Sequence, residues 1–176
     1  MEVLELNKLE CARRQLETAI NLFFHHGDPV SVHTLTCAGY NIVRDVNNSR
    51  DGEPMLAKQR YVEMDGKPAL SDINEPENFF KHGDRDSDGE LTFDPRFTEC
   101  LLVDACEKYS ELTAERVGEF MVFTLWFVCQ SPEVFKIPEG WEAFASDAKR
   151  LHANGDRQGF HERLMAHLSD LGEKGT

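Results

Sequence analysis

Acidic side chains alternate along residues 84–92, and the segment has a glycine at its sixth position. Its oxygen-bearing candidate ligands are Asp84, Asp86, Asp88, Glu90 and Thr92. Alternating carboxylates, a glycine that makes a sharp turn, and a backbone carbonyl at the seventh position are the oxygen ligands that Ca²⁺ takes in proteins. The spacing therefore predicts a divalent-cation site for Ca²⁺ or Mg²⁺ in this acidic loop.

Residues 84–94 resemble most of a calcium-binding loop of the EF-hand family. The bidentate Glu that closes such a loop at its twelfth position is replaced by Pro95, so the predicted cation affinity is weak. A second interpretation needs no metal. Asp-rich turns with a glycine connect helices because Asp accepts hydrogen bonds from nearby backbone N–H groups. Asp94 would then cap a helix that begins at Pro95.

Asn78 and His82 lie four residues apart just before the acidic loop, and Arg85 follows three residues later. This spacing resembles part of the signature of the HEPN superfamily of helical-bundle ribonucleases. The resemblance implies metal-independent RNA cleavage, with His82 as acid or base. Glu77 occupies the position of the family's Arg, so Arg85 is the nearest replacement cation. The segment 78–86 is also similar to small helical-bundle proteins of bacteria, which implies no activity.

A second set of polar residues follows helical spacing. His33, Cys37, Tyr40 and Arg44 are four, three and four residues apart, so they share one helix face. Two interpretations stay open. The face either lines a small polar pocket or forms the half-buried boundary of a bundle. An enzyme is favoured if His33 and Tyr40 meet Asn78 and His82 in one pocket.

Helical periodicity dominates the elements that must position these residues. A first helix is expected to end near residue 26, with Gly27 as its C-cap glycine. Asp28 and Pro29 then start a second helix that pairs with the first as an antiparallel hairpin. The predicted buried stripe of this second helix comprises Val32, Leu35, Gly39, Ile42 and Val46.

Further helices are expected after the hairpin. One opens at residues 75–77, another starts at Asp94-Pro95, and the most hydrophobic one covers residues 113–129. Two more cover residues 141–152 and 156–171. These elements predict an all-α fold, a four- to five-helix bundle with an appended C-terminal helical layer. Residues 1–130 would form the bundle core and residues 131–176 a C-terminal helical segment packed on it, within a single domain.

The charge balance narrows the partners. The chain carries 32 Asp and Glu against 19 Lys and Arg, a net charge of −13, which argues against binding DNA or an anionic membrane. Five cysteines without CxxC spacing, the absence of a signal-peptide pattern and the shortness of the longest apolar run, residues 120–129, favour a cytoplasmic protein. We expect a non-catalytic interaction or regulatory module with a protein partner or as a homodimer. RNA is a ligand only under the ribonuclease alternative.

Overall fold

The computed structural model describes residues 3–55, 57, 70–85, 87–130 and 142–174. Over these residues the chain forms seven helices and no strand, so the all-α prediction is confirmed. Among the described residues, no helix has both the length and the apolar character that crossing a bilayer requires. The helices are α1 (Lys8–Phe24), α2 (Pro29–Ser49), α4 (Leu70–Lys81), α5 (Arg96–Thr113), α6 (Gly118–Gln130), α7 (Glu142–Ala153) and α8 (Arg157–Lys174).

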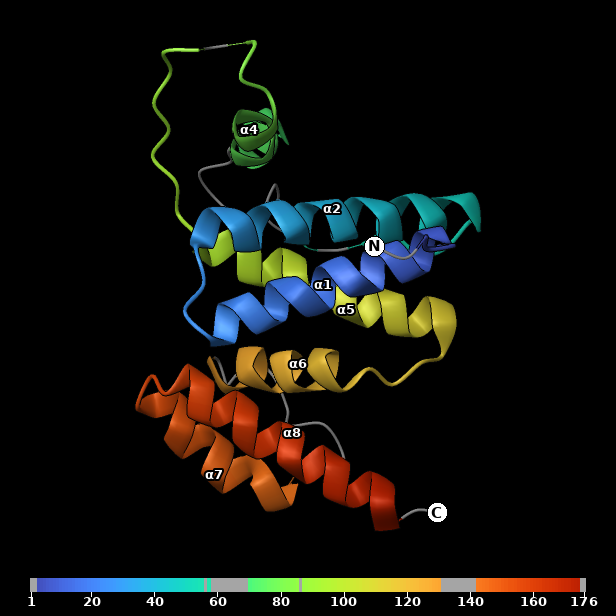
Figure 1. Cartoon of the computed structure of the whole chain (residues 1–176), viewed down its shortest axis with the longest axis vertical. Helices are drawn as coiled ribbons and strands as arrows, with labels where there is room; N and C mark the ends of the chain where they lie inside the picture. Colours follow the sequence, from blue (N-terminus) through green and yellow to red (C-terminus); the bar gives the residue numbers. More distant parts are fainter. Residues whose placement is uncertain (1–2, 56, 58–69, 86, 131–141, 175–176) are drawn as a thin grey trace.

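Four helices form the central bundle. α1 packs against α2, α5 and α6, while α5 also packs against α2 and α6 (Figure 1). α4 lies outside this bundle on α2, and α7 and α8 lie at the opposite side against α6. α1 and α2 form the predicted antiparallel hairpin. The proposed division near residue 130 stays a prediction.

Polar caps start the first two helices. The Asn7 side chain accepts a hydrogen bond from the Glu10 backbone N–H at 2.9 Å, and Asp28 accepts one from Ser31 at 2.8 Å. Pro29 occupies the first turn of α2, where its missing N–H has no helical partner to lose. The predicted start of α2 is confirmed.

The end of α1 differs from the expected glycine cap. His26 takes the left-handed conformation, with φ of 56°, and the Gly27 N–H donates to the Leu22 carbonyl at 2.7 Å. This is the Schellman arrangement with glycine one position further on. Gly27 is needed because a Cβ there would lie 2.8 Å from Leu22 Cβ. A glycine is required at position 27 because the Leu22 side chain approaches the backbone closely, and not because the backbone has a positive φ.

Two predicted helix starts were wrong, those of α4 and α6. α4 begins at Leu70 and contains Pro76 in its interior, although proline has no N–H to donate to the carbonyl four residues earlier. α5 ends at Thr113, since Ala114 is left-handed with φ of 57° and its N–H donates to Ser110. The hydrophobic helix α6 therefore begins at Gly118 rather than at Thr113.

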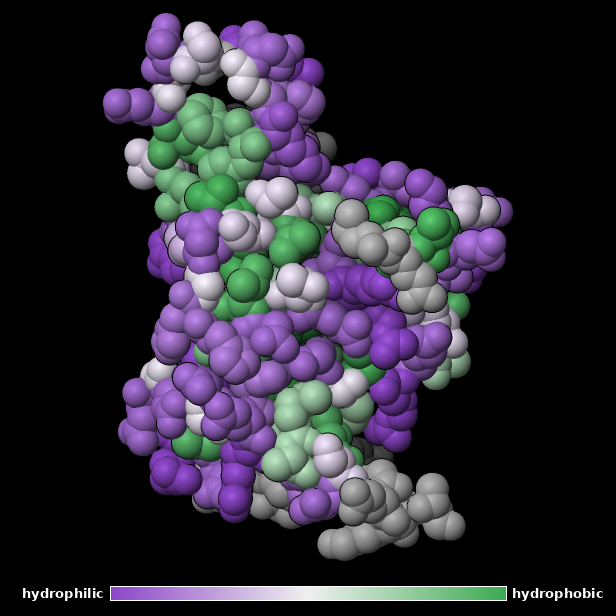
Figure 2. Space-filling view, viewed as in Figure 1, coloured by the Kyte–Doolittle hydropathy of each residue, from purple (hydrophilic) through white to green (hydrophobic). Residues whose placement is uncertain are grey.

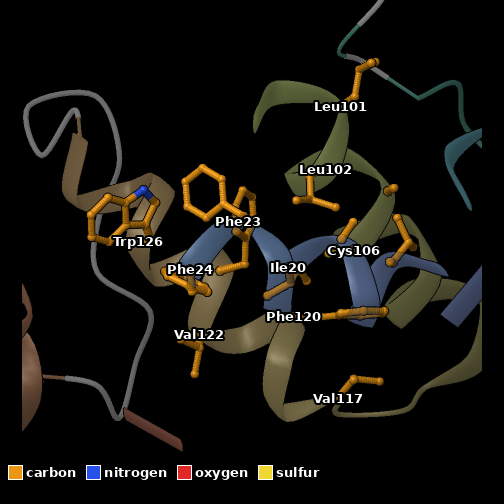
Figure 3. Close-up of a cluster of buried hydrophobic side chains, with 14 of the residues drawn as sticks. Ile20, Phe23, Phe24, Leu101, Leu102, Cys106, Val117, Phe120, Val122 and Trp126 are labelled. Atoms are coloured by element: carbon orange, nitrogen blue, oxygen red, sulfur yellow. The ribbon is translucent and has the colours of Figure 1, made fainter. Parts of the chain in front are cut away.

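Aromatic side chains fill the core between α1, α6 and α8. The Phe24 ring meets Trp126 edge-on with centroids 5.7 Å apart, and it stacks on Phe160 at 6.0 Å. Phe23 contacts Phe123 edge-on at 5.2 Å. Figure 3 shows part of this cluster, with Phe23 and Phe24 on one helix and Trp126 on another. Edge-on pairs contribute roughly 0.5–1.5 kcal/mol each beyond their buried area.

The buried face of α2 is wider than predicted. Val32 and Gly39 are buried as expected, but Leu35, Ile42 and Val46 are only partly buried. α5 covers the neighbouring face, so the buried residues of α2 also include His33, Thr36, Cys37, Tyr40, Val43 and Asn47. The predicted stripe was therefore wrong in its extent. The sequence of one helix does not show how many neighbouring helices cover it.

Candidate functional site: an aromatic and acidic surface on α4

α4 is attached to the outer face of α2 by a shared carboxylate. The Glu77 Oε1 atom accepts hydrogen bonds from Asn41 Nδ2 at 2.6 Å and from Lys81 Nζ at 2.5 Å. The Glu77 side chain is only 11% exposed. Glu77, which stands where the ribonuclease signature has Arg, therefore anchors α4 to the bundle.

An aromatic cluster holds both ends of the acidic loop. Phe80, at the end of α4, and Phe93, just before α5, lie edge-on with ring centroids 5.2 Å apart. Both rings also pack on the buried imidazole of His33, at 5.7 and 5.0 Å. The loop between them is thereby closed at its base and projects away from the bundle (Figure 1).

Apolar side chains remain exposed on α2 and α4, the two helices that contribute to this cluster. Phe79 keeps 37% of its surface exposed and Val30, in the first turn of α2, keeps 40%. Phe79 contacts Phe80 at a centroid distance of 6.2 Å, so it continues the aromatic cluster outward. The space-filling view shows apolar surface gathered around α4 and the adjoining edge of the bundle (Figure 2).

The predicted cation ligands lie in the projecting loop. Asp84, Asp88, Glu90 and Thr92 are exposed, and Asp86 lies outside the described residues. Within the described part of the chain, no three His, Cys, Asp or Glu side chains are grouped closely enough to hold a metal ion. Because Asp86 belongs to the predicted set, the Ca²⁺ or Mg²⁺ site stays a prediction.

Asp94 ends the loop as a capping residue. Its carboxylate accepts a hydrogen bond from the Arg96 backbone N–H at 3.0 Å and also binds the Arg96 guanidinium. These interactions lower the pKa of Asp94 to about 2. The predicted role of Asp94 at the start of α5 is confirmed, although the helix begins one residue later, at Arg96.

We expect Asp94→Asn to lower the melting temperature at neutral pH. The pKa of this carboxyl is lower in the folded chain than its ordinary value of 3.8, so its stabilisation is present above about pH 4 and is lost as the pH falls towards 2. Thermal unfolding of both proteins between pH 2 and 7 measures the difference, which should vanish at the acid end. Asp88→Asn is the control and should not show this pattern.

The residues of the ribonuclease alternative are exposed. Asn78, His82 and Arg85 lie on α4 and in the loop, where the His82 backbone N–H donates to the Asn78 carbonyl at 3.0 Å. His33 and Tyr40 are buried beneath, each with 1% of its surface exposed. The structure thus does not bring the four residues together in one pocket, and the ribonuclease assignment stays a prediction.

The polar face of α2 is hydrogen-bonded to α5. The His33 Nδ1 and Thr98 Oγ1 atoms lie 2.8 Å apart, and the His33 Nε2 atom lies 3.3 Å from Cys37 Sγ. The Tyr40 hydroxyl donates to Asp104 Oδ2 at 3.3 Å. His33, Cys37 and Tyr40 thus belong to a buried structural network between two helices. Arg44 is only partly buried and pairs with Asp45, so the half-buried boundary holds at Arg44 alone.

Sequence reasoning missed the partners in this network. Thr98 and Asp104 lie 65 and 64 positions from the residues that they contact on α2. No local spacing in the sequence connects residues that far apart. A usable signal was the polar residues themselves, because a His and a Tyr on a helix beside a buried stripe need hydrogen-bond partners when they are covered.

The fold and this surface define an all-α protein that presents the exposed Phe79 side chain on the helix that leads into a projecting acidic loop. No protein family, curated protein or solved structure matches the chain.

Proposed function

We propose that the chain is a non-catalytic cytoplasmic interaction module that binds a basic, amphipathic segment of a partner protein. Its binding surface, here called the α4 surface, comprises Val30, Phe79, Asp84, Asp88 and Glu90. The observations that carry the proposal are the exposure of Phe79 on α4 and of Val30 in the first turn of α2, and the exposed carboxylates of the loop that follows α4. An amphipathic segment supplies apolar anchors for the first pair and cations for the second.

The charge of the α4 surface favours a basic partner. Lys81 and Arg96 are already paired with Glu77 and Asp94. The loop carboxylates of Asp84, Asp88 and Glu90 form no ion pair with a described residue, and Arg85 is the cation among them. With a net charge of −13, the chain attracts cationic segments and repels a second copy of itself. A basic partner is therefore favoured over a homodimer.

The contacts that hold α4 against α2 make the α4 surface a preformed binding surface. Glu77 joins α4 to Asn41, and the Phe80 and Phe93 rings close the loop over His33. Phe79 is thus held outward without a need to order the helix on binding. Preorganisation of this kind reduces the entropic cost of association.

The cysteines support a reducing compartment and a non-catalytic role. All five are described and none forms a disulfide. Burial raises the pKa of Cys100, Cys106 and Cys129, which keeps these thiols protonated. A protonated thiol is a poor nucleophile.

The proposal is tested with a synthetic amphipathic helical peptide of Leu and Lys and with its Leu and Glu counterpart. We expect the basic peptide to bind and the acidic one not to bind, in calorimetric titrations at matched ionic strength. Phe79→Ser should weaken binding on the order of tenfold, as loss of an aromatic anchor does. Leu6→Ser is the matched control, because Leu6 is 42% exposed but lies on the segment before α1.

Two results would contradict the proposal. Equal affinity of Phe79→Ser, Leu6→Ser and the unchanged protein would place the peptide elsewhere. Self-association of the unchanged protein in sedimentation, abolished by Phe79→Ser, would assign the α4 surface to a second copy of the chain. The contribution of charge is tested with the double variant Asp84→Asn and Asp88→Asn. This variant should bind the basic peptide more weakly, and its affinity should depend less on the salt concentration.

A further inference from the structure

A small cavity lies where three helices begin. The cavity has a volume of about 80 Å³ and is bordered by the first turns of α2 and α5, the end of α1 and the first residue of α8. Its apolar lining includes Phe23, Val32 and Leu102, and its polar lining includes Thr98, Glu99 and Arg157. The Phe23 and Leu102 side chains belong to the core cluster in Figure 3.

Arg157 contributes a cation to the cavity wall. Its guanidinium carbon lies 4.2 Å from the centre of the Phe23 ring and 6.0 Å from that of Trp126. These contacts hold the guanidinium over the Phe23 ring and use none of its N–H groups. Among the described residues, the guanidinium forms no hydrogen bond and no ion pair within 4.0 Å. A planar guanidinium with free N–H groups is suited to bind a carboxylate through two parallel hydrogen bonds.

Glu99 is the acid of the same cavity. Burial raises the pKa of its carboxyl, against the opposing effects of the Gln130 amide, Arg157 and Trp126. The Trp126 indole N–H is near enough to favour the charged form of Glu99, yet it is buried with no partner within hydrogen-bond distance. The site thus has a buried indole N–H without a hydrogen-bond partner near the Glu99 carboxyl, whose pKa is raised by burial.

The surrounding helices add positive potential. The N-terminal end of a helix carries a partial positive charge, and the lining includes first-turn residues of α2, of α5 and of α8. Apolar walls lower the local dielectric constant and strengthen these effects. The cavity therefore combines an anion-favouring field with room for an alkyl group.

We propose that this cavity binds a short-chain aliphatic carboxylate, with Arg157 as its ion-pair partner and Phe23, Val32 and Leu102 around its alkyl group. The volume suits a ligand of acetate or propionate size, because one water molecule takes about 30 Å³ in the liquid. A doubly charged anion such as phosphate fits less well, since it would meet Glu99 and the apolar walls. The proposal is independent of the α4 surface.

The test titrates the isotopically labelled chain with sodium propionate at constant ionic strength and follows NMR signals. We expect saturable shifts at Phe23, Val32 and Leu102, and none with methylammonium chloride. Arg157→Gln should reduce the affinity for propionate on the order of tenfold or more, because it removes one partner of a close charge pair. Arg163→Gln is the matched control on α8, because Arg163 is exposed and lies 3.6 Å from Asp147.

Two further variants keep the cavity assignment falsifiable. Val32→Leu narrows the cavity while it retains Arg157, and it should abolish binding. Glu99→Gln removes the negative charge of the lining, and it should tighten binding. Equal propionate affinity in Arg157→Gln and Arg163→Gln, undiminished binding by folded Val32→Leu, or saturable methylammonium binding at the same signals would each overturn the proposal. Circular dichroism confirms that each variant is folded.

Discussion

Phe24→Ala should lower the free energy of unfolding by about 3–5 kcal/mol, the usual cost of removing a buried aromatic ring. Phe24 has no exposed surface. Its ring lies 5.7 Å from Trp126 and 5.0 Å from His161, measured between centroids. The change leaves a cavity where α1 meets α6 and α8. Because 1 kcal/mol shifts the melting temperature of a chain of this size by about 2–4 °C, the expected decrease is about 6–20 °C.

Urea denaturation followed by circular dichroism measures this loss. Phe79→Ala is the control for removal of a phenyl ring, because Phe79 is 37% exposed on α4. Its cost should stay below about 1 kcal/mol, as for most surface substitutions. Equal losses in the two variants would show that Phe24 does not join α1 to the C-terminal helices in the way described.

Gly39→Ala should destabilise the chain although alanine is the better helix former. Alanine gains about 1 kcal/mol in helix propensity over glycine. At this position, however, its Cβ would lie 2.7 Å from Leu16 Cγ and 3.3 Å from the Ala12 carbonyl oxygen. Leu16 is fully buried, so it has no free space into which to move. Overpacking of this kind costs about 1–3 kcal/mol, so after the gain in helix propensity we expect a net loss of up to about 2 kcal/mol.

Gly118→Ala is the matched control for the glycine at the α1–α2 contact. A Cβ at Gly118 would lie 3.5 Å from Met165 Cε, which is an ordinary van der Waals distance. We therefore expect between no change and a gain of about 1 kcal/mol. Urea denaturation of both variants measures the change in the free energy of unfolding. A stabilised Gly39→Ala protein would mean that α1 and α2 separate more easily than their packing indicates.

Part of the candidate site was accessible from the sequence. The segment from Asn78 to Asp94 was identified as the place of a site, and it forms the end of α4 and the projecting loop. Its partners were not accessible, because Glu77 contacts Asn41 and Phe93 contacts His33 across long separations in the chain. The exposure of Phe79 could not be predicted either, because Phe79 and Phe80 are the same residue type. Their positions on α4 decide that Phe79 is exposed and that Phe80 packs on His33.

The sequence by itself determined the helical class and several helix ends, because periodicity and caps act over a few residues. Asp28 and Pro29 start α2 for reasons present in four consecutive positions. Only the tertiary structure decided which faces were buried. His33, Cys37 and Tyr40 became interior because α5 covers them, and Arg157 reached the cavity at Phe23 because α8 returns to α1. Such contacts depend on how whole helices pack, and local spacing does not contain that information.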